Sequence, residues 1–116
     1  MKRFLIIALL LLLFSACEDK SKSIKPSRLL TEKEMIDIMT DMQIIEADIN
    51  VQKSHGEEIG DKQRVYYRQL FEHYGITDSI FNENLRYYTD NPATIERIMD
   101  SVTQRIISLA QQQLDH

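Results

Sequence analysis

Apolar residues recur every three or four positions over most of this chain, which is the spacing of one face of an α-helix. The longest such stretch predicts a helix from Thr31 to about Lys53. Thr31 and Glu34 match a capping box, because a hydroxyl and a carboxylate three residues apart can bond each other's backbone N–H groups. The helix carries a main apolar strip and a second, weaker one, formed by Met35, Ile38, Met39, Met42, Ile45 and Ile49 and by Ile36, Ile44, Ala47 and Val51. Two strips predict a central helix with neighbours on both sides.

The same periodicity predicts three further helices, over residues 61–74, 77–88 and 92–114. Gly75 fits the left-handed position that ends a helix, and Asn91 with Pro92 fits an N-cap followed by the first helical residue. The last helix has a seam with spacings of four and three, made of Ile95, Met99, Val102, Ile106 and Leu109. No alternating strand pattern competes. The predicted fold is all-α, a small bundle of four helices, two long and two short, within residues 29–116.

The first 16 residues have the pattern of a signal peptide. Lys2 and Arg3 precede an apolar run, Phe4–Phe14, and small residues follow it. A helix of that length rises roughly 16 Å, whereas a membrane span needs about 30 Å. The run is therefore too short for an ordinary transmembrane helix.

Cys17 directly follows Ser15 and Ala16 and is the only cysteine of the chain. This arrangement predicts a lipobox. The chain would be cut before Cys17, which would become the new N-terminal residue and carry two acyl chains on its thiol-linked glyceryl group. Phe14 stands where leucine is usual, and a retained anchor or a plain signal peptide with a chance cysteine are the alternatives. At least two acyl chains on one residue suffice for stable membrane attachment. We therefore expect membrane anchoring through lipid.

Composition narrows the partners. Residues 17–28 are mostly polar and are expected to form a flexible tether after the lipidated cysteine. Without Lys2 and Arg3, 12 basic residues remain against 18 acidic ones, a net charge of −6. Such a charge argues against nucleic acid as a partner. Residues Glu18 and Asp19 leave the choice between the periplasmic and the surface face of the membrane open.

Several polar residues lie on or near apolar faces. Glu46 falls within the main strip of the first predicted helix, where it needs an arginine or a tyrosine hydroxyl as partner, or serves a ligand. Asp41 belongs to an acidic row with Asp37 and Asp48, which we expect to face solvent. Tyr87 and Tyr88 point about 100° apart, so one is expected at the surface, where tyrosine suits an interface. Asn84 is expected to be a hydrogen-bonded core amide.

No catalytic or metal-binding pattern stands out. The three histidines lack zinc-ligand spacing, no nucleophile lies beside a base, and the three glycines all fit loops or helix ends. We therefore expect a protein that is not an enzyme and has no cofactor.

Four segments together resemble a known family. They are residues 41–47, the Tyr-Gly-Ile-Thr sequence of residues 74–77, residues 81–88 with the Tyr87–Tyr88 pair, and Asn91-Pro92. In this order they resemble the family called domain of unknown function 4296, small helical bacterial lipoproteins. The resemblance covers residues 29–109 and implies an envelope lipoprotein of Gram-negative bacteria, with no known activity or site. Asn84 departs from the small residue that the family pattern favours.

Two functions follow as expectations. The first is a non-catalytic envelope lipoprotein, attached to the outer membrane, that binds an envelope protein as an accessory or assembly subunit. The second is a chaperone-like or small-ligand-binding module with Glu46 at the floor of a groove lined by Met35, Met39 and Met42, whose flexible side chains adapt to varied ligands.

Overall fold

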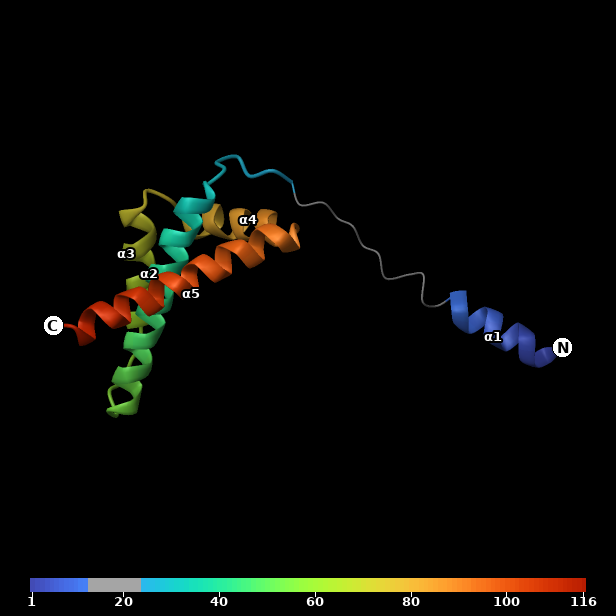
Figure 1. Ribbon diagram of the computed structural model, residues 1–116, viewed down its shortest axis with the longest axis horizontal. Coiled ribbons are helices and arrows are strands. Elements are labelled where there is room, and N and C mark those ends of the chain that lie inside the picture. Colours follow the sequence, from blue (N-terminus) through green and yellow to red (C-terminus); the bar gives the residue numbers. More distant parts are fainter. Residues whose placement is uncertain (13–23) are drawn as a thin grey trace.

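Helices account for all the regular structure in the described residues, 1–12 and 24–116, of the computed structural model (Figure 1). The helices are α1 (Lys2–Leu12), α2 (Glu32–Ser54), α3 (Lys62–His73), α4 (Asp78–Thr89) and α5 (Pro92–Leu114). The all-α prediction is confirmed. The structure adds a helix, α1, within the segment predicted as a signal peptide, and it describes five helices instead of four. None of the described helices is both long enough and apolar enough to cross a membrane. Cys17 and most of the predicted tether lie outside the described residues.

Side chains at the helix starts explain where the helices begin. Thr31 accepts a hydrogen bond from the Glu34 N–H at 3.1 Å, and the Glu34 carboxylate accepts one from the Thr31 N–H at 2.7 Å. This capping box is the predicted one. The side chains of Thr77 and Asn91 cap α4 and α5 by accepting a hydrogen bond from the N–H groups of Ile80 and Thr94. Gly75 has a φ of +66°, the left-handed conformation that ends α3.

The central helix is α2, which packs against α3 and against α5, while α4 packs against α5. In Figure 1, α5 crosses α2 steeply, and the C-terminal ends of the two helices diverge. The prediction of a central helix with neighbours on both sides is confirmed. Its second strip is only partly covered, however, because Ile44 and Val51 keep 46% and 53% of their surface exposed.

The core lies where α2, α4 and α5 meet the α3–α4 connection. Its buried side chains come from these segments, from α3 and from the residues just before α2: Leu30, Met35, Ile38, Phe71, Ile76, Phe81, Tyr88 and Ile98. The predicted seam of α5 is partly wrong. Val102 is buried as predicted, whereas Met99 and Leu109 are each 39% exposed and Ile98, outside the predicted seam, is buried. The steep crossing explains the exposure of Leu109, because it leaves the last turns of α5 free of α2.

Residues 26–30, the entry strap, lie against the bundle before α2 begins. Pro26 and Leu30 are buried, and the Arg28 guanidinium donates to the Gly75 carbonyl at 2.6 Å. Asn84 is fully buried and bonds the strap twice, accepting from the Leu30 N–H and donating to the Arg28 carbonyl, each at 2.8 Å. The Tyr88 hydroxyl donates to the Leu30 carbonyl. The last residues of the predicted tether are thus held by α4, and the prediction for Asn84 is confirmed.

Candidate interaction surface

Glu46 is half-buried between α2 and α3, and its partners come from α3. The Tyr67 hydroxyl and the Gln63 amide both donate to Oε1 of Glu46, the amide at 3.0 Å. Of the partners considered from the sequence, the tyrosine hydroxyl is the one the structure provides. Burial, and then the hydrogen bond to Glu46, raise the pKa of Tyr67 to about 12. Glu46 therefore links two helices.

Asp41 and Asp37 do not face solvent as predicted. Asp41 is half-buried and accepts a hydrogen bond from the Tyr74 hydroxyl. Burial and this bond raise the pKa of Tyr74 well above its usual range. Asp37 binds Lys33 on its own helix at 2.8 Å and Arg105 of α5, and these cations lower its pKa. The prediction holds for Asp48, which is exposed, and fails for the other two because α2 is central, so neighbouring helices reach part of its polar side.

Tyr87 and Tyr88 separate as their helical positions require. Tyr88 is buried, and its hydroxyl binds the entry strap; Tyr87 is half-buried with its ring edge-on to Tyr88, at 5.3 Å between centroids. Neither side chain stands free at the surface. Glu46, Asp41 and Tyr88 all lie in contacts between segments of the bundle, and they do not gather at one site.

Replacing Tyr67 by phenylalanine tests the link to Glu46. We expect a loss of about 1 kcal/mol in the free energy of unfolding at pH 8, the usual net value of one hydrogen bond. The folded pKa of Tyr67 lies above the ordinary 10.0, so the stability it contributes is complete below pH 10 and is lost as the pH rises through about 12. Urea unfolding between pH 8 and 12 should therefore show a shallower decline for Tyr67→Phe than for the unchanged protein.

The control for this prediction is Tyr66→Phe, on the same helix. The Tyr66 side chain is also half-buried. Its hydroxyl has no hydrogen bond within the described part of the chain. Equal effects of the two substitutions at pH 8 would contradict a specific role for the Tyr67 hydroxyl.

A free apolar surface centres on the middle of α2. One groove of about 700 Å³ lies between α2 and the end of α5, and another of about 390 Å³ lies between α2 and α3. Ile44 lines both grooves. We call this surface the α2 face, and its apolar lining consists of Ile44, Ile45, Ala47, Tyr66, Leu70, Ile106, Leu109 and Ala110.

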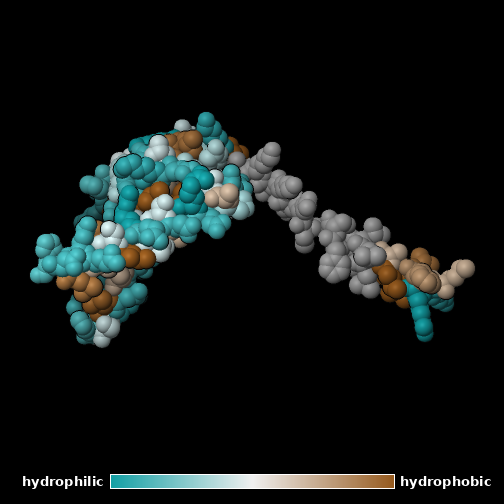
Figure 2. Space-filling model, viewed as in Figure 1, coloured by the Kyte–Doolittle hydropathy of each residue, from teal (hydrophilic) through white to brown (hydrophobic). Residues whose placement is uncertain are grey.

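The α2 face is open at the surface of the molecule. Figure 2 shows hydrophobic residues, in brown, gathered in the angle between the diverging ends of α2 and α5. Polar side chains stand at the rim, with Gln112 and Gln113 on α5 and Asp41 and Gln69 toward α3. An apolar floor with a polar rim is the usual composition of a protein-binding surface. The sequence analysis did not name Ile44 as a binding residue. The available signal was its place in the second apolar strip of the helix, which the neighbouring helices leave partly uncovered.

The methionines proposed to line a ligand groove lie elsewhere. Met35 is fully buried in the core, and Met39 and Met42 are half-buried against it. The two grooves of the α2 face are lined by other residues. The described residues also contain no group of three His, Cys, Asp or Glu side chains placed to hold a metal ion.

Comparison with known families supplies an identification. A family model described as Domain of unknown function (DUF4296) matches residues 26–112. The chain belongs to this family. The resemblance seen in the sequence is therefore confirmed. No curated protein and no solved structure matches the chain significantly.

The DUF4296 match coincides with structural boundaries. It begins at Pro26, the buried proline of the entry strap, and ends at Gln112, near the end of α5. The strap thus belongs to the DUF4296 domain along with the helices. The α2 face also lies within the matched residues, except for Gln113 and His116 at the α5 groove.

Proposed function

We propose that this protein is a non-catalytic envelope lipoprotein that binds another envelope protein through the α2 face. In this proposal Cys17 carries the lipid, the residues between it and the entry strap form a tether, and α2–α5 form the mature bundle of four helices. The lipid places the protein on the outer membrane of a bacterial envelope. The single observation that carries the binding function is Ile44, exposed by 46% at the centre of an apolar surface.

The shape and charge of the α2 face favour one kind of occupant. A groove between two diverging helices suits a third helix, whose apolar side would lie along α2 and α5. The chain has a net charge of −4, and Asp41 stands at the rim. A helix with basic residues beside its apolar side is therefore favoured by charge. A second copy of this chain would bring the same negative charge and is disfavoured.

Ile44→Asp is the variant that tests the surface. In this proposal Ile44 is a binding hot spot, because it lies at the centre of the apolar interface. A charge there should weaken partner binding at least tenfold, by about 2 kcal/mol. The measurement is recovery of a stoichiometric partner with the tagged full chain from detergent-solubilised envelopes. Sedimentation of the purified chain, run in parallel, reports whether a second copy occupies the face instead.

The matched control is Ile107→Asp. Ile107 is also an isoleucine, is also 46% exposed, and lies on α5 outside the lining of both grooves. We expect its partner binding to remain unchanged. Equal recovery of the partner by Ile44→Asp and by the unchanged protein would overturn the proposal, and so would equal loss by both variants.

A further inference from the structure

A second pocket, separate from the α2 face, lies between α3 and the start of α4. It has a volume of about 570 Å³, within the range of small-molecule sites. Its lining comes from one side of α3 and from the connection to α4: Arg64, Tyr67, Arg68, Phe71, Glu72, Ile76, Thr77 and Asp78. None of these residues lines the α2 face.

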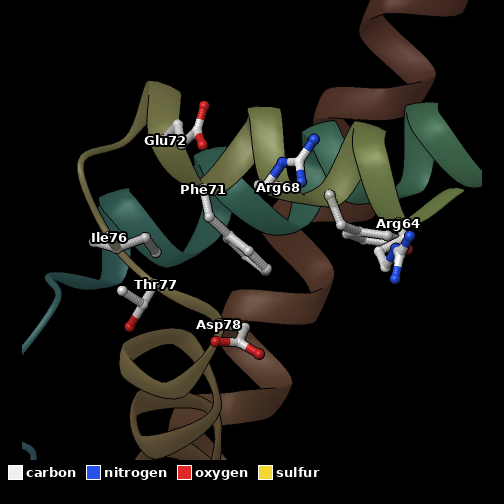
Figure 3. A pocket seen from close by; sticks show the side chains of 8 residues that line it. Arg64, Arg68, Phe71, Glu72, Ile76, Thr77 and Asp78 are labelled. Atoms are coloured by element: carbon white, nitrogen blue, oxygen red, sulfur yellow. The ribbon is translucent and has the colours of Figure 1, made fainter. Parts of the chain in front are cut away.

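The floor of the pocket is aromatic and rigid. Phe71 is 9% exposed and stacks on Phe81 with 5.5 Å between ring centroids, and the Tyr67 ring centroid lies 6.3 Å from that of Phe71. The Tyr67 hydroxyl is held by Glu46, which keeps that ring in place. In Figure 3 the Phe71 ring points from α3 into the space above Asp78. A ring or an alkyl group could stack there without rearrangement of the floor.

Two arginines stand one helical turn apart at the edge of this floor. Arg64 has only an exposed ion pair with Asp61, at 3.4 Å, and such pairs contribute little. Arg68 forms no ion pair with any described residue, although acidic residues outnumber basic ones in the chain. Arg68 lines the same pocket as Phe71, and Figure 3 shows its guanidinium on the upper side of α3 in this view, with the Phe71 ring on the lower side. A guanidinium in this position can bind a carboxylate with two parallel hydrogen bonds.

The acidic residues of the pocket limit the charge of the ligand. Glu72 directs its carboxylate away from the Phe71 ring in Figure 3. Asp78 lies across the pocket from the arginines and accepts a hydrogen bond from the Ser79 N–H at 2.8 Å. Its negative charge opposes a doubly charged anion more strongly than a singly charged one.

We propose that this pocket binds a small amphiphilic carboxylate, with its apolar group on Phe71 and its carboxylate on the guanidinium of Arg68, assisted by Arg64. Ile76 closes the apolar side, and it is 6% exposed. Asp78 selects a single negative charge. The site would let the protein respond to a metabolite independently of what occupies the α2 face.

The experiment uses indole-3-acetate as the probe and the full chain in nanodiscs of zwitterionic lipid. Ligand-observed saturation-transfer NMR measures binding by titration, with a Kd on the order of 1 mM expected for so small a ligand. Indole-3-acetamide has the same ring and no charge, and should bind about tenfold more weakly, because a charge-assisted hydrogen bond is lost. Equal binding of the two probes would overturn the proposal.

Two variants test whether Arg68 and Asp78 act on the carboxylate of the probe. Arg68→Gln should weaken indole-3-acetate about tenfold and leave indole-3-acetamide unchanged, whereas Asp78→Asn should tighten indole-3-acetate at least about twofold. Lys53→Gln removes an equal charge from the end of α2 and should change neither. The proposal fails if Arg68→Gln and Lys53→Gln behave alike, or if Asp78→Asn weakens the binding of indole-3-acetate. Circular dichroism of each variant separates loss of binding from loss of fold.

Discussion

Replacing Asn84 by alanine is expected to lower the free energy of unfolding by about 3 kcal/mol. The side chain is completely buried and makes three hydrogen bonds, to the Leu30 N–H and to the carbonyls of Arg28 and Ile80. Alanine leaves the buried Leu30 N–H without a partner, which costs about 1–3 kcal/mol, and adds a small cavity. A small domain has a total stability near 5 kcal/mol, so more than half would be lost.

Urea and thermal unfolding of the full chain, followed by circular dichroism, measure this effect. A loss of 3 kcal/mol corresponds to a fall in Tm of roughly 15 °C for a domain of this size. Asn82→Ala is the control, because Asn82 lies on the exposed side of the same helix. Both changes replace asparagine with a better helix former, so the difference between them isolates the buried bonds. Equal stabilities of the two variants would show that the bonds of Asn84 contribute nothing.

Replacing Cys17 by serine is expected to move the protein out of the membrane fraction. Serine offers no thiol for acylation, and the proposed anchor depends on the two or more chains that this residue would carry. The helix α1 cannot substitute for the lipid, because its 11 residues rise roughly 16 Å, about half of the apolar thickness of a bilayer. Fractionation of envelopes, with immunodetection of membrane and soluble pools, measures the change.

The outcome is informative only if the bundle stays folded. We therefore expect Cys17→Ser to unfold at the same urea concentration as the unchanged protein, since residue 17 lies outside the domain matched by the family model. Ser21→Ala changes a residue of the same predicted tether and should leave the protein on the membrane. Retention of folded Cys17→Ser protein in washed membranes would refute the lipid anchor.

Helix ends were the part of the fold that local chemistry made predictable. The capping box of α2, the cap at Asn91 and the left-handed Gly75 each depend on residues within four positions of one another. Such hydrogen bonds require only the right residue types at the right spacing along the chain. Their prediction needed no knowledge of how the helices pack.

The buried side of α5 was not predictable in the same way. Its pattern predicted a seam in which Val102 is indeed buried, but Met99 and Leu109 of that seam are each 39% exposed, and Ile98, outside the seam, is buried instead. An apolar pattern gives the direction of a helix face, whereas the crossing angle with α2 decides which residues of that face are covered. That angle depends on side chains of both helices.

The polar residues were misjudged for a related reason. Asp37 and Asp41 were expected in solvent, but Arg105 and Tyr74 reach them from α5 and α3. Their partners lie 68 and 33 residues away along the chain, so no local pattern announces them. The pocket that combines Arg64 and Arg68 with Phe71 was not predicted either, because a binding role for these arginines depends on an aromatic floor that only the folded chain provides.

The entry strap also decides where tension enters the protein. The strap is joined to α4 by three hydrogen bonds within residues 28–30, from the side chains of Asn84 and Tyr88. A pull on the chain before Pro26 therefore acts first on α4, and through α4 on α5, before it reaches the first turn of α2. The hydrogen bonds between the strap and α4 thus separate movement of the preceding chain from α2, the helix at the centre of the bundle.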